Sequence, residues 1–120
     1  MSYMPADRTL EVSSANAAAA NNQTLAAAAG LRTYIAGFEV TGGGATGASV
    51  IAVTVTGLLN TLTFYLPIPA GAAVGVQPLQ ILFDPPLPAS ADNTAIVVNV
   101  PSFGAGNTQA AAAAWGFQTN

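Results

Sequence analysis

Neither cysteine nor histidine occurs among the 120 residues of the chain. Without cysteine there is no disulfide framework and no thiolate chemistry, and the redox compartment stays undetermined. Without histidine the chain lacks the commonest metal ligand and general base of proteins. A chain of this length still forms one domain that can bury a core without covalent staples.

Charge is scarce as well, because Asp, Glu, Lys and Arg together make up 6% of the residues, against about 25% in an ordinary soluble domain. Lysine is absent, which excludes a Walker-type phosphate loop. Two arginines are too few for a phosphate-binding stripe, so we expect no nucleic-acid partner. The charged residues are Asp7, Arg8, Glu11, Arg32, Glu39, Asp84 and Asp92.

An uncharged run covers residues 40–83 and raises the question of a membrane span. Threonines recur in this run, and Pro67, Pro69 and Pro78 interrupt it, whereas a spanning helix needs about 20 predominantly apolar residues. The N-terminal sequence MSYMPADRTLEV has neither the basic start nor the apolar stretch of a signal peptide. We therefore expect no membrane partner and no export by the standard secretory route.

The glycine-rich sequence VTGGGATGASV places Gly42, Gly44 and Gly47 in the G-x-G-x-x-G pattern of dinucleotide-binding turns. In such turns a helix follows the glycines, and an acidic residue lies about 20 positions further on. Here residues 48–57 alternate with a period of two and are rich in β-branched side chains, which predicts a strand. No acidic residue lies at the required distance. We interpret the glycines as a loop that joins two strands.

Alternating apolar side chains recur along most of the chain and predict strands. The segments between the alternating runs are rich in Gly, Pro, Asn and Ser, as turns are. We therefore expect an all-β fold, an antiparallel β-sandwich of seven or eight strands. The expected strands are 8–14, 23–28, 31–41, 49–57, 61–67, 78–84, 93–101 and 109–118.

Alternation also assigns side chains to the two faces of each strand. In the strand 31–41 the set expected on one face is Tyr34, Ala36, Phe38 and Val40. Arg32 and Glu39 are an odd number of positions apart, so we expect them on opposite faces, each meeting a neighbouring strand or a partner. The apolar rows expected in other strands are Leu10 and Val12; Ile51, Val53 and Val55; Leu62, Phe64 and Leu66; Leu79, Ile81 and Phe83; Ile96, Val98 and Val100.

Three alanine tracts, 17–20, 26–29 and 110–114, leave two interpretations open. Alanine is the best helix former, so a helix over 15–29 competes with a strand there, although two asparagines interrupt it. The third tract runs into a Trp-x-Phe sequence, which favours a strand whose small side chains let another surface approach closely.

Few residues could carry catalysis, because general acid–base and nucleophilic routes need His, Cys, Lys or matched carboxylates. Asp84 and Asp92 flank the sequence PPLPASA and could form a carboxylate pair or a hard-cation site. The structural alternative places Asp84 at a strand end and Asp92 in an Asx-type turn with Asn93. We favour the structural alternative and expect no catalytic residue, no cofactor and no metal ion.

Aromatic side chains could instead line a sugar-binding face. The candidates are Tyr34, Phe38, Phe64, Tyr65, Trp115 and Phe117. Their apolar neighbours alternate with them, which favours the core for most of them. A carbohydrate-binding module is the alternative function, and it requires aromatic side chains exposed to solvent.

The surface itself needs an explanation, because a free β-sandwich usually protects its edge strands with charges, lysines or prolines. The positions expected to face solvent are mostly Thr, Ala, Asn and Gly, which give little colloidal repulsion. We therefore expect much of the surface to be covered in the working state, by identical copies or by a larger assembly.

Two segments, LRTYIAGFEVTGGGATGASVIAVTVTG and DNTAIVVNVPSFGAGNTQAAAAAWGF, resemble small structural proteins of tailed bacteriophages. In that group a G-[KL]-R-x-Y-I-x-G strand opens the domain, and an N-T-A-[IV]-V-V segment with a Gly-Ala-Gly-Asn turn lies near its end. The resemblance spans Asn22 to Phe117 and rests on packing and turn motifs. Many relatives have Lys where Leu31 stands, so this chain lacks the charged contact available there.

Proteins of this group are capsid decoration, or cement, proteins with a jelly-roll fold, bound outside HK97-type shells. The resemblance implies a jelly-roll-like sandwich, the major capsid protein as partner, and a place on the exterior of a virion assembled in a bacterial cytoplasm. It also implies a structural role without catalysis. We expect a homo-oligomer, a dimer or trimer, that contacts the capsid through the exposed ends of the sandwich (23–120) and the N-terminal arm or first strand (1–22).

Overall fold

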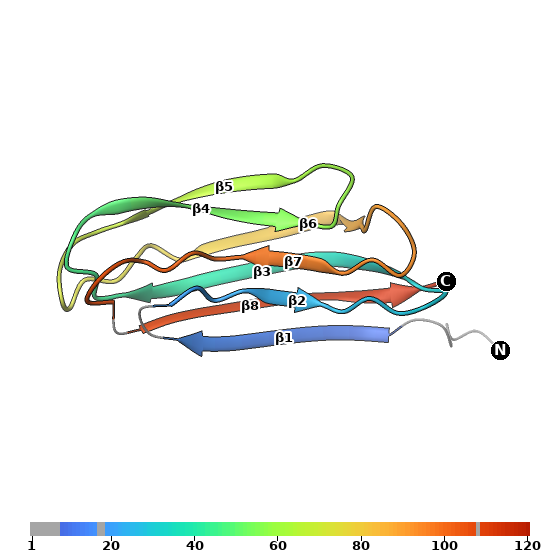
Figure 1. The fold of residues 1–120 in the computed structure, drawn as a ribbon, viewed down its shortest axis with the longest axis horizontal. Coiled ribbons are helices and arrows are strands. Elements are labelled where there is room, and N and C mark those ends of the chain that lie inside the picture. Colours follow the sequence, from blue (N-terminus) through green and yellow to red (C-terminus); the bar gives the residue numbers. More distant parts are fainter. Residues whose placement is uncertain (1–7, 17–18, 108) are drawn as a thin grey trace.

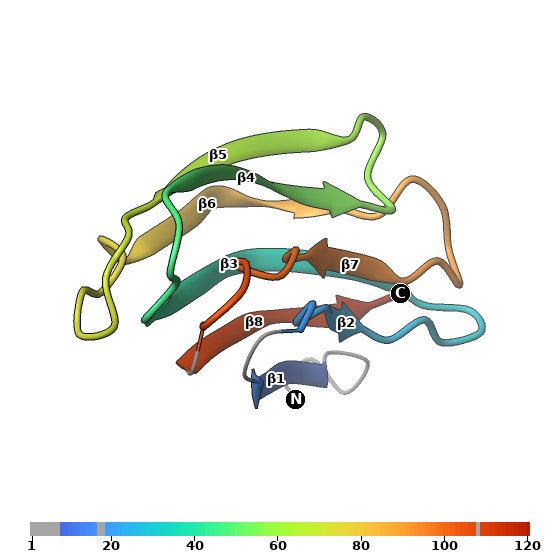
Figure 2. The ribbon, with the colours of Figure 1, turned by 60° about the vertical axis from the view of Figure 1, so that its left-hand side comes forward.

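Eight β-strands form the regular structure of the residues that the computed structural model describes, 8–16, 19–107 and 109–120 (Figure 1). They lie in two antiparallel sheets of four strands each, which Figure 2 shows as two layers. No helix occurs within these ranges, and the expected all-β sandwich is confirmed. The strands are β1 (Arg8–Asn16), β2 (Gln23–Leu25), β3 (Arg32–Gly43), β4 (Ser49–Thr56), β5 (Leu62–Ile68), β6 (Leu79–Pro88), β7 (Ile96–Asn99) and β8 (Gln109–Thr119).

The strands pair as one long hairpin rolled up on itself. β1 pairs with β8, β2 with β7, β3 with β6 and β4 with β5, so each pair encloses the next along the chain. Pairing of β3 with β8 and of β4 with β7 joins them into the sheets β1-β8-β3-β6 and β2-β7-β4-β5. This is the jelly-roll arrangement of eight strands, and it confirms the expected fold class.

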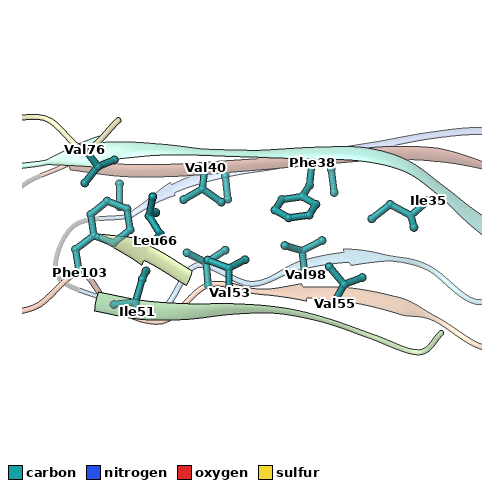
Figure 3. Packing of buried hydrophobic residues seen from close by; sticks show 14 of the residues in the cluster. Ile35, Phe38, Val40, Ile51, Val53, Val55, Leu66, Val76, Val98 and Phe103 are labelled. Atoms are coloured by element: carbon teal, nitrogen blue, oxygen red, sulfur yellow. The ribbon is translucent and has the colours of Figure 1, made fainter. Parts of the chain in front are cut away.

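Side chains from the two facing sheets fill the core. Phe38 and Val40 of β3 point toward Val53 of β4 and Val98 of β7 (Figure 3). The apolar rows expected in β1, β4, β5, β6 and β7 all lie in this core or pack against it. Each fully buried side chain of this size contributes about 1.5–3 kcal/mol to the free energy of folding.

A β-bulge in β3 overturns the faces expected for that strand. Ile35 pairs with Gly116, but Gly37 pairs with Trp115, so Ala36 has no partner of its own on β8. An extra residue shifts the alternation of side chains by one position. Both Ile35 and Phe38 therefore point into the core (Figure 3).

Side chains before and after the bulge consequently do not lie on the faces that simple alternation assigns to them. Tyr34 lies on the outer side of the sheet, opposite Phe38, so the expected common face of these two residues is wrong. Arg32 and Glu39 both lie on the outer side, so the expectation of opposite faces is also wrong. The physical reason in both cases is the unpaired Ala36.

The edge strand β6 is longer than the expected strand 78–84, because it continues to Pro88. Its residues 83–86 lie between the pairs Leu82–Gly37 and Leu87–Ile35, opposite the bulge of β3. Proline cannot donate a hydrogen bond to a neighbouring strand and is tolerated mainly at sheet edges. The prolines interpreted as a connector thus lie in a strand, where they protect an edge that has few charges.

Strand β8 confirms the strand interpretation of the third alanine tract. Its inward side chains Ala110, Ala112 and Ala114 are buried. The alternating Ala111 and Ala113 lie on the outer side of the same sheet, where they are half-buried. Small side chains thus occupy both sides of this central strand.

A buried amide network holds the chain between β1 and β2, where a helix over 15–29 was the competing interpretation. In the described part of that segment, β1 reaches Asn16, β2 covers Gln23–Leu25, and no helix forms. The Asn21 side chain donates to the carbonyl of Ser14 at 3.2 Å and accepts from Gln23 Nε2 at 2.9 Å. Its backbone N–H donates to the carbonyl of Val100 at 2.8 Å. These bonds tie the two sheets together along one side.

We expect Gly116→Ala to lower the free energy of unfolding by about 1–3 kcal/mol or more. A Cβ atom at Gly116 would lie 1.9 Å from the carbonyl oxygen of Tyr34, so the strands β8 and β3 must separate. Gly47→Ala is the control, because a Cβ there meets nothing within 4 Å, and it should leave stability equal or slightly higher. Urea unfolding of the two variants measures the difference, and equal losses would contradict the close approach of β3 and β8.

Candidate functional site

Of the two aspartates considered as a carboxylate pair, Asp92 is bound by an arginine and Asp84 lies in the edge strand β6. Asp92 accepts a hydrogen bond from Arg32 Nε at 3.1 Å, in an ion pair whose side chains are 39% (Arg32) and 64% (Asp92) exposed. An exposed pair of this kind contributes about 0–1 kcal/mol. Asp84 lies inside β6, so the expectation that it ends a strand is wrong. Within the described ranges no group of three or more His, Cys, Asp or Glu side chains could hold a metal ion.

The glycine-rich loop joins β3 to β4, as its interpretation predicted, and no helix follows it. Its amides are engaged within the protein: Gly44 N–H donates to the carbonyl of Val74 at 3.1 Å, and Thr46 N–H to the carbonyl of Ala105 at 2.9 Å. A phosphate-binding loop needs such amides directed at the ligand. These hydrogen bonds instead join the glycine-rich loop to the loops that contain Val74 and Ala105.

The aromatic candidates divide between the core and the outer surface. Phe38 and Phe64 pack edge-to-face in the core, with ring centroids 5.5 Å apart. Tyr65 of β5 points outward and is 72% exposed. The remaining three, Tyr34, Trp115 and Phe117, lie on the outer side of the sheet β1-β8-β3-β6. The expectation that most of the candidates belong to the core is therefore wrong.

Trp115 lies at the centre of this outer side, which we call the tryptophan face. A Cβ atom built at Gly37 would be 2.7 Å from Cζ2 of the indole, so the ring lies directly over Gly37 and covers it. Beside it, the rings of Tyr34 and Phe117 stack with centroids 4.9 Å apart and planes 9° from parallel. The outward residues that define the face are Glu11 and Ser13 of β1, Trp115, Phe117, Ala111 and Ala113 of β8, Tyr34, Gly37, Glu39 and Thr41 of β3, and Gln80 and Leu82 of β6.

A shallow groove continues the tryptophan face along β8. It has a volume of about 300 Å³, and Ala111 and Ala113 form its floor. Glu39 stands at its side and accepts a hydrogen bond from Gln80 Nε2 at 3.1 Å. The complete lining is Ser13, Ser14, Ala15, Glu39, Thr41 and residues 111–113. The groove exists because the outward side chains of β8 are methyl groups at these positions.

The outer side of the sheet β2-β7-β4-β5 is different, because no strand of this sheet contains a charged residue. We call it the uncharged face; its outward residues are Thr24, Val50, Ala52, Thr54, Thr56, Thr63, Tyr65, Val97 and Asn99. Next to it, the β4–β5 turn exposes 85% of Leu59. That side chain borders an apolar pocket of about 280 Å³, which Leu58, Leu62 and Leu87 also line.

The sequence contained one signal for the tryptophan face that the alternation pattern did not use. A glycine inside a strand often marks a bulge or a close approach of another group. Gly37 is both, because it follows the unpaired Ala36 and lies beneath the indole of Trp115. If Gly37 is read as the site of a bulge, the sequence predicts that Tyr34 and Phe38 lie on opposite faces of the strand.

We expect Gly37→Ala to displace the indole of Trp115, because the added methyl group would overlap the ring and approach the carbonyl of Ile81. Trp115 is the only tryptophan, so its fluorescence reports this site alone. The emission should move to longer wavelength and acrylamide quenching should increase, whereas Gly47→Ala should change neither. Unchanged emission in Gly37→Ala would show that the ring does not lie over Gly37.

Comparisons with known proteins leave the family open. No family model matches the chain, and searches of curated proteins and of solved structures give no significant match. In the part of the chain that the structure describes, no helix is long and apolar enough to cross a membrane.

Proposed function

We propose that the protein is a non-enzymatic virion component, a decoration or cement protein that binds the outer surface of the major capsid shell and stabilises it. The observation that carries the proposal is the uncharged face, a side of the sandwich with no charged residue in any of its four strands. Charged residues are depleted at the centre of protein interfaces, because burying them costs free energy. The jelly-roll topology, common among viral capsid domains, supports the same role.

One end of the sandwich offers a second support. The β4–β5 turn, which contains the exposed Leu59, lies at the end of the sandwich where β1 begins and β8 finishes (Figure 1). The ends of the sandwich and the arm 1–22 are the contacts expected from the sequence. Residues 8–16 of that arm form β1 of the sandwich, and residues 1–7, 17 and 18 lie outside the described residues.

The proposed mechanism is thermodynamic. A protein that binds the assembled shell but not its separated subunits shifts the equilibrium toward the shell by mass action. At a concentration of 100 times Kd this contributes about 2.7 kcal/mol for each occupied site. Copies that form a dimer or trimer would bind at local symmetry axes, where identical contacts repeat.

The alternative is a carbohydrate-binding module associated with the tail or a fibre. The outward position of Trp115, Tyr34 and Phe117 is the observation that favours it. A tail component and a capsid component differ in copy number by a large factor, which separates the two.

We expect the copy number in purified particles to be near one per capsid subunit, or a simple fraction of it. Quantitative mass spectrometry against the major capsid protein measures this ratio. A handful of copies per particle would place the protein at the tail or portal, and its absence from particles would overturn the virion proposal.

We expect Ala52→Lys to weaken binding to capsids that lack the protein by about tenfold or more, a loss of about 1.4 kcal/mol or more. Ala52 lies at the centre of the uncharged face, where a docked lysine would lose its hydration. Thr9→Lys, on the outer side of the other sheet, is the matched control and should bind normally. Co-sedimentation with capsids measures both, and equal binding would exclude the uncharged face as the contact.

A further inference from the structure

We propose that the tryptophan face binds a linear, neutral oligosaccharide, with Trp115 as its stacking platform and the alanine-floored groove as its continuation. The site lies on the opposite side of the sandwich from the uncharged face. It deepens the carbohydrate-binding alternative, and it holds equally for a decoration protein that presents this side to solvent. Sugar binding and capsid binding can therefore succeed or fail separately.

The indole of Trp115 has the geometry of a platform. It packs directly on Gly37, where even a methyl group would collide with the ring, so β3 supports the ring from below. Trp115 is half-buried, so part of the side chain is accessible to solvent. The face of an aromatic ring carries partial negative charge, and the C–H groups on one side of a pyranose ring are apolar and weakly positive. A sugar ring therefore stacks well on such a surface.

Hydrogen-bonding side chains surround this platform. Glu11 is the cross-strand neighbour of Trp115 on β1. Glu39 lies one outward position further along β3, with Gln80 donating to its Oε2 at 3.1 Å. The Glu39–Gln80 pair presents carboxylate acceptors beside an amide that also donates. Two neighbouring hydroxyl groups of a sugar need that combination, because each hydroxyl both donates and accepts.

The groove gives this site its length. The outward positions 111–117 of β8 run along one strand and span roughly 20 Å, enough for several sugar rings in a row. The small side chains of Ala111 and Ala113 form the floor of the first part of the groove, and the hydroxyl-bearing Ser13 and Thr41 line its sides. The groove is open along its length, which suits a chain held on its side better than an enclosed small molecule.

Charge selects the class of sugar. The face carries Glu11 and Glu39. The two arginines of the same sheet lie at its end: Arg32 at the start of β3 is paired with Asp92, and Arg8 at the start of β1 lies opposite Gln118, whose side chain is buried. Two carboxylates beside the indole, with both arginines at the end of the sheet, disfavour uronic or sialic acids and phosphates next to Trp115. A basic peptide is the competing ligand, since indole and carboxylate both attract arginine. The donor–acceptor pair and the hydroxyl-lined groove favour the neutral sugar.

The test is a fluorescence titration of Trp115 in the full chain. The probes are linear hexasaccharides of β-1,4-glucose, α-1,4-glucose, β-1,4-N-acetylglucosamine and β-1,4-mannose, with hexagalacturonate and hexa-arginine as the charged comparisons. We expect at least one neutral hexasaccharide to give a saturable response with Kd below about 1 mM, and hexagalacturonate to give none. No saturable response to any neutral hexasaccharide would overturn the proposal, and so would a response to hexa-arginine alone.

Variants then assign the site by calorimetry with the sugar that binds. Trp115→Ala should weaken binding at least about tenfold, Trp115→Tyr should restore part of it, and Glu39→Gln should weaken it less than Trp115→Ala. Tyr65→Ala is the matched control, since it removes an exposed aromatic side chain from the other sheet. Equal losses in Tyr65→Ala and Trp115→Ala would overturn the assignment. Normal capsid binding by Trp115→Ala would show that the sugar site and the capsid contact are different surfaces.

Discussion

The bulge at Ala36 and Gly37 of β3 is the constraint on which the sheet β1-β8-β3-β6 depends. Because Ala36 has no partner on β8, the alternation of side chains shifts by one position there, and residues after the bulge point to the other side of the sheet than unbroken alternation would give. Ile35 and Phe38 can then both fill the sandwich, although they are three residues apart. The same shift moves Tyr34 outward and leaves Gly37 as the surface on which Trp115 lies. Core and tryptophan face are thus two results of one backbone irregularity.

Strand β8 complements the bulge because its side chains are small where neighbours come close. Its inward alanines are buried beneath the opposite sheet, and Ala111 and Ala113 leave the groove open on the outer side. The two outer sides of the sandwich consequently differ in chemistry. One bears an aromatic platform with two carboxylates, whereas the other bears no charge in its strands. Two chemically different sides suit a protein that binds an assembly through one side and faces solvent with the other.

Much of the fold could be predicted from the sequence, because β4, β5 and β7 are short strands with unbroken alternation. The interpretation of the glycine-rich loop was also correct, since an alternating strand follows it. Prediction failed where pairing with a neighbour overrides the local pattern, namely at Ala36 and at the proline-containing end of β6. The tryptophan face was missed for the same reason, because the register of three strands assembles it. Local alternation contains no information about that register.

The most direct test of this account is the reactivity of single cysteines, which the absence of native cysteine makes unambiguous. The variants are Tyr34→Cys, Ile35→Cys, Phe38→Cys and Glu39→Cys, each treated with a thiol reagent under native conditions. The bulge predicts rapid modification at positions 34 and 39 and much slower modification at 35 and 38. A strand with unbroken alternation would instead make position 34 behave like 38 and position 35 behave like 39, and that result would contradict the account.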